Sequence, residues 1–260
     1  HHSGGTVCEP TDVPVNKRHL DMLLAHMMLS DKPFMGSVTE PSRAQDSVDM
    51  CDILFGKDFV QGNTVMTSLI NINSPMTFDD VMMGALEVYA RNNQACIVSS
   101  FIVGGAMSPV SVAGTLTQVL AEVTAGIAYS QLVRPGAPAI FGAFVASIDM
   151  NSGAPTFGTP EASHILYGAG QLARRLELPF RSGGGLCGSK LPDVQAAYES
   201  SNTLNAGLLG GVNFMLHSCG WLEGGLVSSF EKFVMDADQL GVLHHLAKGI
   251  ETDVNAQAMD

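Results

Sequence analysis

The chain has 260 residues and a formal net charge of −12. An acidic balance of this size argues against nucleic acid as a partner, because neutralising phosphates requires a basic face. No apolar run approaches the roughly 20 residues that span a bilayer, and no signal peptide is recognisable, so no membrane partner is expected. The five cysteines lack paired spacing, which indicates reduced thiols and a cytoplasmic location.

Seven short β-rich runs follow one another along the chain, and helix-like stretches separate them. The runs cover residues 1–7, 34–38, 63–70, 95–101, 138–145, 179–184 and 213–219. Strands that alternate with amphipathic helices are typical of βαβ units and a parallel sheet. We therefore predict an α/β fold, a TIM-type (β/α)8 barrel with about seven β/α units. Residues 1–260 are expected to form one barrel domain truncated at both ends, because about eight units close such a barrel.

Apolar periodicity predicts helices over residues 19–30, 78–91, 112–132, 161–176 and 194–208. The region 222–248 is predicted to be helical, with a break near Gly241 that divides it into two helices. Three segments after strands are long and rich in Gly, Pro, Ser and Asn, namely residues 104–111, 147–159 and 183–190. Because barrels place their chemistry where strands end, these loops indicate the functional face.

Aromatic and acidic residues gather near the predicted strand ends. Phe101 and Phe144 end two of the strands, and Trp221 follows the last one. The nearby carboxylates are Glu9, Glu40, Asp149 and Glu223. Each carboxylate alone is typical of a helix cap or a solvated charge. Together with the three rings they predict an acidic and aromatic pocket for a cation, because ring faces attract quaternary ammonium groups.

Polar side chains at other strand ends supply further candidate contacts. Asn71 and Asn73 follow the third strand and would donate neutral hydrogen bonds in the same pocket. His217 ends the seventh strand, where we expect it to meet a polar ligand. A zinc site built from Cys187, His217 and Cys219 lacks the usual ligand spacing, so no metal is expected.

A glycine-rich segment follows the sixth strand and comprises Gly183, Gly184, Gly185, Leu186, Cys187, Gly188, Ser189 and Lys190. A phosphate-binding P-loop ends in Gly-Lys-Ser or Gly-Lys-Thr, whereas the serine here precedes the lysine. Two interpretations remain open: a plain turn, or a strand exit that a large ligand approaches closely. A desolvated Lys190 would also suit a Schiff-base nucleophile in a phosphate-binding barrel lyase or aldolase.

Several sequence blocks, in the same order along the chain, resemble the trimethylamine methyltransferase family of corrinoid-dependent methyltransferases. They include Asp31-Lys32-Pro33-Phe34, Arg134-Pro135-Gly136-Ala137-Pro138, Ser189-Lys190-Leu191-Pro192-Asp193 and Cys219-Gly220-Trp221-Leu222-Glu223. The resemblance implies a barrel whose mouth docks a separate corrinoid (cobalamin) protein. A methyl group would pass from a small methylated amine to the cobalt, which performs the difficult chemistry.

The resemblance also indicates which class of methylated amine is the substrate. Trimethylamine-specific members carry pyrrolysine, which this sequence lacks, so the non-pyrrolysine branch similar to glycine betaine methyltransferase is favoured. A quaternary ammonium leaves as a neutral amine and needs no further activation. His217 or backbone N–H groups near residues 183–185 would receive a substrate carboxylate, and the glycine-rich segment would face the corrinoid. A non-catalytic module that binds betaine or docks the corrinoid protein remains an alternative, and the sequence leaves a homo-oligomer open.

Overall fold

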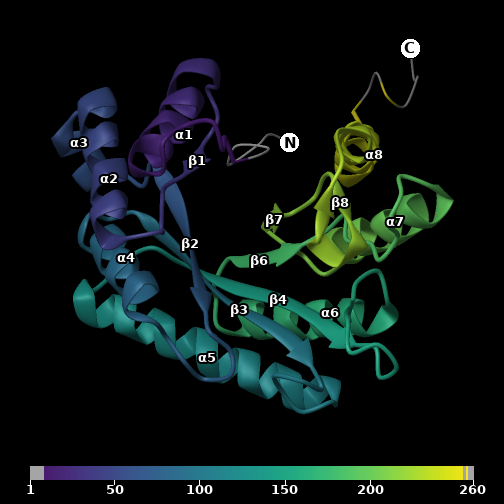
Figure 1. Cartoon of the computed structure of the whole chain (residues 1–260). Coiled ribbons are helices and arrows are strands. Elements are labelled where there is room, and N and C mark those ends of the chain that lie inside the picture. Colours follow the sequence, from purple (N-terminus) through teal and green to yellow (C-terminus); the bar gives the residue numbers. More distant parts are fainter. Residues whose placement is uncertain (1–8, 254–255, 257–260) are drawn as a thin grey trace.

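The computed structural model describes residues 9–253 and 256 of the chain. Within them, six parallel strands form a sheet in the order β1-β2-β3-β4-β6-β7, and β5 pairs antiparallel with β4. The sheet curls into a half-barrel whose concave side faces away from the helices (Figure 1). The strands are β1 (Phe34–Met35), β2 (Met66–Ile72), β3 (Ala95–Gly104), β4 (Ala139–Ile148), β5 (Pro155–Thr156), β6 (Phe180–Gly183) and β7 (Phe214–Leu216).

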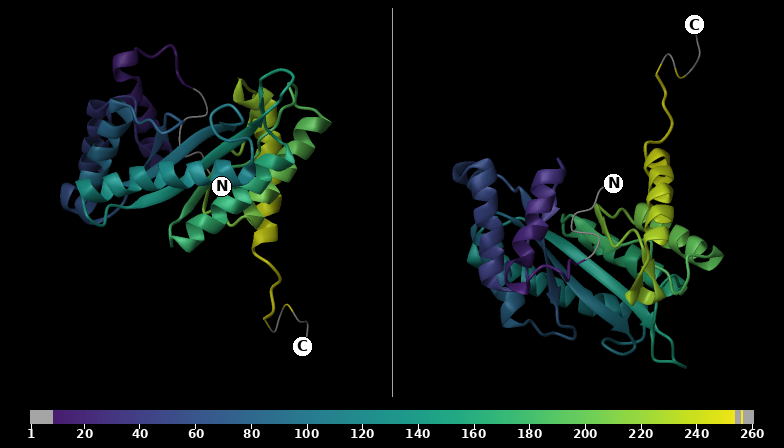
Figure 2. Two further views of the ribbon diagram at one scale, coloured as in Figure 1. Left: turned by 90° about the horizontal axis from the view of Figure 1, so that it is seen from below. Right: turned by 45° about the horizontal axis from the view of Figure 1, so that its top comes forward.

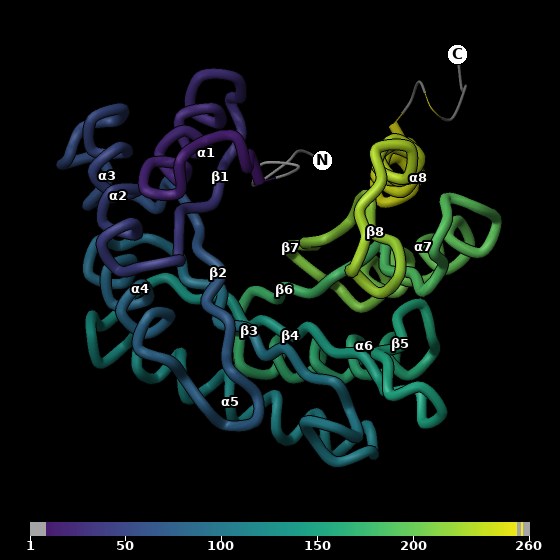
Figure 3. The backbone as a smooth tube through the Cα atoms, viewed as in Figure 1, coloured from purple at the N-terminus to yellow at the C-terminus, as the bar shows by residue number. Residues whose placement is uncertain are grey.

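Helices cover the outer side of the curled sheet. The backbone tube passes around the curve in chain order, from α1 and β1 at one end to β7 and α8 at the other (Figure 3). Viewed from below, the long helix α5 runs along the outside of the central strands (Figure 2). The helices are α1 (Val15–Leu29), α2 (Pro41–Phe55), α3 (Lys57–Gly62), α4 (Asp80–Arg91), α5 (Val112–Val133), α6 (Pro160–Arg175), α7 (Val194–Leu209) and α8 (Phe230–Ala247).

Local sequence signals explain where several helices begin. The side chain of Asp79 accepts a hydrogen bond from the backbone N–H of Met82 at the start of α4. Ser111 caps α5 in the same way. Asp193 caps α7 by accepting from the N–H of Ala196. Each cap satisfies a backbone donor that has no partner within the helix, which is why these residue types are favoured there.

The main hydrophobic core lies between the sheet and its outer helices. It includes Val98 and Ile102 of β3, Phe141 of β4, Phe180 of β6 and Val123 of α5, all buried. Nearly every position of β3 is buried, as expected for a central strand with helices on one face and side chains of the neighbouring strands packed on the other. The exception is Phe101, which is 41% exposed on the concave side.

The structure confirms the α/β barrel prediction as a half-barrel, and the six predicted runs that it describes all contain strands. The first predicted run, residues 1–7, lies outside the described residues. The prediction of two helices over 222–248 was wrong. A short hairpin of β8 (Trp221–Leu222) and β9 (Val227–Ser228), joined by the 3-10 turn Glu223–Gly225, is followed by α8, which passes through Gly241 without a break.

Helix α2 was not anticipated, and its composition explains why. Its buried positions are Ala44, Ser47, Val48 and Cys51, which have helical spacing but are small or polar. Such a face produces a weak apolar period, so the pattern that predicts amphipathic helices does not register it.

Candidate active site on the concave face

The strand register brings side chains from four strands onto one face of the sheet. Asn71 of β2 is in register with Ser99 of β3, and Phe101 of β3 is in register with Phe144 of β4. Gly142, two residues before Phe144, is in register with Arg181 of β6. Because side chains alternate between faces along a strand, these residues all belong to the same face. The strand register therefore places Asn71, Phe101 and Phe144 on one face of the sheet, and their contacts with a ligand stay predictions.

Phe144 lies at the centre of an aromatic cluster near the carboxyl ends of these strands. Its ring centroid lies 5.8 Å from that of Phe101, 5.7 Å from Phe157 and 5.6 Å from Trp221. Trp221 meets both Phe144 and Phe157 edge to face, and His217 completes the group. Such tilted and stacked pairs contribute stability beyond the area they bury. The cluster therefore presents ring faces and edges in a favourable mutual geometry.

Arg181 is the most unusual residue of this face. It is 1% exposed, and its guanidinium lies 5.2 Å from the centroid of Phe144. It donates hydrogen bonds to Ser99 Oγ (2.9 Å) and to His217 Nδ1 (3.0 Å), while its Nε has no partner among the described residues. No carboxylate of the described chain forms an ion pair with it. A buried charge normally has a counter-ion, because desolvating it is costly.

Gly142 allows Arg181 to reach Ser99 across the intervening strand. The order β3-β4-β6 places β4 between the two residues. A Cβ atom at Gly142 would stand 2.6 Å from the Cβ of Ser99, so no other residue fits there without displacing the strand. The absence of a side chain at this point leaves a path for the long arginine side chain over the sheet.

His217 is held neutral next to Arg181. Burial and the neighbouring Arg181 charge lower the pKa of His217 to about 3. Since a guanidinium only donates, Nδ1 of the ring must accept, which places the ring proton on Nε2. Nε2 donates to none of the described residues. Burial lowers the pKa of Arg181 to about 10, so this side chain carries the positive charge at neutral pH.

The depressed pKa of His217 predicts a pH-dependent stability. In the unfolded chain the imidazole takes up a proton below about pH 6.5, whereas the folded chain resists it down to about pH 3. This contribution to stability is therefore complete above pH 6.5 and is lost as the pH falls, by about 2 kcal/mol at pH 5. The variant His217→Gln keeps an acceptor for Arg181 but has no imidazole to protonate. Its free energy of unfolding in urea should therefore fall less between pH 7 and pH 5 than that of wild type. Equal losses would contradict the neutral, buried imidazole.

The glycine-rich loop after β6 is packed against the site rather than extended into solvent. Gly183, Gly184, Gly185, Leu186 and Cys187 are buried, whereas Gly188 and Lys190 are exposed. The Leu186 N–H donates to Thr203 Oγ1 of α7, and the Gly188 N–H donates to a carboxylate oxygen of Glu199. A macromolecule approaching this loop would therefore meet the exposed part around Lys190.

The predicted carboxylates have local partners. Glu223 forms an ion pair with the exposed Lys190 at 3.3 Å. Glu9 pairs with Arg18, Glu40 with Arg43, and Asp149 accepts hydrogen bonds from its own loop. The contacts of the described residues thus make the centre of the face aromatic and basic, and a ligand contact of Glu223 stays a prediction.

Asn71 and Asn73 lie at the end of β2 but have different surroundings. Asn71 is exposed and lies in register with Ser99 on the neighbouring strand. Ser99 is the residue that accepts a hydrogen bond from Arg181. The backbone of Asn73 closes a small turn through hydrogen bonds with Thr77. Asn71 therefore belongs to the face that carries the aromatic cluster, and ligand contacts of both asparagines stay predictions.

Sequence reasoning missed Arg181, Ser99 and Phe157. Arg181 stands inside a short strand next to the buried Phe180, and a basic residue within a buried strand is itself a signal. Phe157 lies in the loop after β5, and only its three-dimensional contacts with Phe144 and Trp221 reveal its role. Ser99 carries no signal in the sequence, since nothing in its own strand indicates that a side chain from β6 reaches it.

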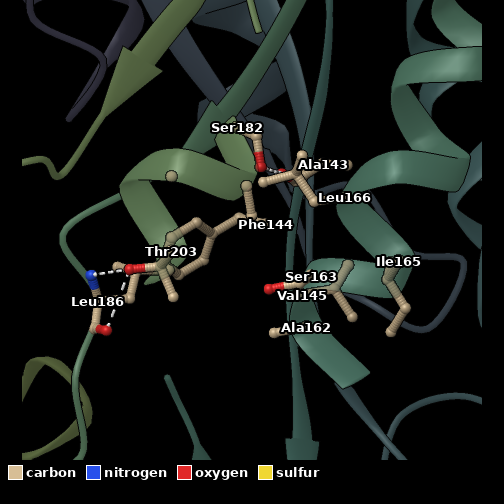
Figure 4. A pocket seen from close by; sticks show the side chains of 12 residues that line it. Ala143, Phe144, Val145, Ala162, Ser163, Ile165, Leu166, Ser182, Leu186 and Thr203 are labelled. Carbon is tan, nitrogen blue, oxygen red and sulfur yellow. Dashed lines mark hydrogen bonds between the residues drawn. The ribbon is translucent and has the colours of Figure 1, made fainter. Parts of the chain in front are cut away.

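Two cavities lie away from the concave aromatic cluster or behind it. The first, of about 20 Å³, lies between the sheet and helices α6 and α7, with Ser182, Leu186 and Thr203 among its lining residues (Figure 4). It has room for little more than one water molecule. The second, of about 470 Å³, lies beside α1, and among its lining residues Arg18 pairs with Glu9 and His19 is hydrogen-bonded to Asp46. Neither has an uncompensated charge like that of Arg181.

The described residues also limit other kinds of site. Among them, no three His, Cys, Asp or Glu side chains gather in a way that would hold a metal ion. None of the helices in this part of the chain is both long enough and apolar enough to cross a membrane. Cys51, Cys96, Cys187 and Cys219 carry free thiols.

A curled parallel sheet with functional side chains at its strand ends is the arrangement of a β/α-barrel enzyme class. The family model described as trimethylamine methyltransferase (MTTB) matches residues 1–260. The chain is 46% identical to a glycine betaine methyltransferase of Desulfitobacterium hafniense (strain Y51), over 100% of this chain and 54% of that protein. The chain belongs to the trimethylamine methyltransferase family, which confirms the resemblance recognised in its sequence blocks.

More distant relatives belong to the same group. A proline betaine:corrinoid methyltransferase of Eubacterium limosum is 28% identical, over 92% of this chain and 51% of that protein. The trimethylamine methyltransferase MttB of Methanosarcina barkeri (strain Fusaro / DSM 804) is 34% identical, over 63% of this chain and 33% of that protein. The chain spans about half the length of the first two curated relatives.

Proposed function

We propose that this chain forms the substrate-binding half-barrel of a cytoplasmic methyltransferase that acts on a betaine, a quaternary ammonium compound with a carboxylate. The methyl acceptor would be the corrinoid of a separate protein. The observation that carries the proposal is Arg181, a buried cation with no counter-ion among the described residues. A substrate carboxylate would supply the missing negative charge.

The basic part of the face suits the carboxylate end of a betaine. Arginine is the preferred residue for a buried carboxylate, because its planar fork presents several N–H donors to two oxygens. Nε of Arg181 has no hydrogen-bond partner in the part of the chain that the structure describes, and the neutral His217 has its proton on Nε2. Both groups can therefore donate to an anion without breaking a bond that the structure shows.

The aromatic part suits the ammonium end. Phe101 leaves 41% of its surface exposed while stacking on Phe144, and Trp221 stands beside it as the third ring. Ring faces stabilise an N-trimethyl group that cannot donate hydrogen bonds. A cation without a carboxylate, such as choline, would be repelled by Arg181, so the two parts together select a zwitterion.

The reaction then requires little from acid or base groups of the chain. When the methyl group leaves, the ammonium nitrogen keeps the bonding electron pair and departs as a neutral tertiary amine. The corrinoid supplies the nucleophile, and residues of this chain bind the substrate, fix its orientation and exclude water. The exposed end of the glycine-rich loop at Gly188 and Lys190 is the part of that segment that a corrinoid protein can contact.

The lyase or aldolase alternative has no structural support. An activated lysine nucleophile is desolvated or lies beside another cation. The side chain of Lys190 is 76% exposed and forms an ion pair with Glu223. The alternative of a non-catalytic binding module is left for the experiment to decide.

The test is a methyl-transfer assay with cob(I)alamin, read by mass spectrometry of the demethylated amine. Glycine betaine and proline betaine are expected to react at least tenfold faster than choline and trimethylamine, because only the first two have a carboxylate for Arg181. Faster reaction of choline or trimethylamine would contradict the proposal. Betaine binding in calorimetry without any transfer, even with a corrinoid protein present, would establish the non-catalytic module instead.

A further inference from the structure

A buried ion pair on α8 lies directly behind the segment that carries His217 and Trp221. Lys232 and Asp236 are one helical turn apart, with 0% and 3% of their side-chain surfaces exposed. The Lys232 Nζ lies 2.5 Å from both carboxylate oxygens of Asp236 and 2.7 Å from Ser200 Oγ of α7. Neither residue is a member of the aromatic cluster, and the proposed methyl-transfer chemistry does not use them.

Hydrogen bonds connect the pair to both loops that border the site, directly to Gly220 and through Ser200 to Gly185. Asp236 Oδ2 accepts a hydrogen bond of 2.9 Å from the backbone N–H of Gly220, the residue just before Trp221. Ser200, which Lys232 contacts, donates to the carbonyl oxygen of Gly185 at 3.2 Å. Gly185 in turn packs so closely on Ser218 that a Cβ atom there would stand 2.4 Å from the Ser218 carbonyl oxygen. The two loops are thus fixed to each other and to α8.

Stability alone is a poor explanation for such a pair. Replacing a buried ion pair with apolar residues of similar volume is often neutral or stabilising, because desolvation consumes the Coulomb attraction. What apolar residues cannot supply is an acceptor for the Gly220 N–H. Without that bond a buried backbone donor would lack a partner, and residues 217–222 would move to find one.

We propose that Lys232 and Asp236 are positioning residues that hold residues 217–222 in place, so that His217 and Trp221 stand against Phe144. This inference rests on the proposed function, since the cluster they position is the proposed betaine site. Asp236 acts through Gly220, and Lys232 donates hydrogen bonds to the Asp236 carboxylate and connects it through Ser200 to Gly185. A displacement of about 1 Å at such a site is enough to cost substantial activity.

The experiment compares two double variants of the whole chain that both lack the ion pair. Lys232→Met with Asp236→Asn keeps an amide oxygen as acceptor for Gly220, whereas Lys232→Met with Asp236→Leu removes it. The first is expected to bind glycine betaine within about threefold of wild type in calorimetry, and the second at least tenfold more weakly. Melting temperatures of both are measured, because a purely structural role would make affinity loss follow stability loss.

A second readout needs no ligand. Trp221 is the only tryptophan of the chain, so its fluorescence reports directly on residues 217–222. Acrylamide should quench the Asp236→Leu double variant more strongly than wild type or the Asp236→Asn double variant. Equal quenching and equal affinity of the two double variants would overturn the inference. If wild type binds no betaine but the quenching differs, the proposed function fails while the positioning role stands.

Amide exchange in the wild-type chain covers the case in which the leucine variant does not fold. The Gly220 N–H should exchange at least a hundredfold more slowly than the N–H of the exposed Met150, because Asp236 holds the Gly220 N–H in a buried hydrogen bond. Exchange of Gly220 as fast as that of Met150 would overturn the inference without any variant.

Discussion

Replacing Arg181 with methionine is expected to lower the affinity for glycine betaine about a hundredfold or more while leaving the protein folded. The guanidinium is the only charge within the concave face that the contacts of the described residues leave without a counter-ion. Removing one partner of a buried charge pair typically costs 2 to 5 kcal/mol, roughly thirtyfold to several thousandfold in affinity. Isothermal calorimetry measures the loss directly.

The variant Arg181→Met should be as stable as wild type or more stable, although its affinity for betaine falls. Methionine fills a similar volume without the cost of burying an uncompensated charge, so the melting temperature is expected at or above that of wild type. Arg175→Met on the exposed side of α6 is the matched control, since it removes the same charge far from the face. A variant Arg181→Met that binds betaine as tightly as Arg175→Met would refute the role of Arg181.

Truncating Phe144 should damage both folding and binding. Phe144 is 6% exposed and contacts three other aromatic rings, His217 and the Arg181 guanidinium. Phe144→Ala is expected to lower the free energy of unfolding by about 3 to 5 kcal/mol, as for other buried phenylalanines. The measurement is unfolding in denaturant, where the slope of the unfolding free energy against denaturant concentration should stay unchanged. An altered slope would signal a change in compactness rather than lost packing.

Leucine variants separate the binding role of this ring from its packing role. Phe141 lies three residues earlier on the same strand and packs against Phe180 on the opposite, outer side of the sheet. Phe144→Leu and Phe141→Leu should lose similar amounts of stability, yet only Phe144→Leu should bind betaine about 5- to 30-fold more weakly, because it removes ring faces from the ammonium site. Similar affinities for the two variants would show that the cluster is packing alone.

The fold was largely predictable because parallel strands and covering helices leave strong periodic signals. The helix over residues 112–132 was predicted within one residue of α5, where the cap Ser111 and an apolar sequence agree. The region after residue 222 was misread because its hairpin depends on glycines at positive φ, such as Gly224 and Gly225, within an otherwise apolar stretch. Local composition there resembles a helix, and only the backbone geometry distinguishes the two.

The candidate site was predictable only where chemistry coincides with a strand end. Phe144, Trp221 and His217 were found because they occupy such positions, and the structure brings their rings within 6 Å of one another. Arg181 was missed because its role depends on Gly142 and Ser99, which lie far away in the sequence. A pattern along one chain segment does not show which residues face each other across a sheet.

Because Gly142 on β4 has no side chain, the guanidinium of Arg181 can lie over a different strand from the one that carries the residue. The guanidinium starts on β6 and ends over β3, whereas the rings come from β3, β4 and the loops beyond. If Arg181 binds a substrate carboxylate as proposed, replacing this one residue of β6 would remove the anion contact and leave the ring surfaces of β3 and β4 in place. The same half-barrel would then suit amines that have no carboxylate.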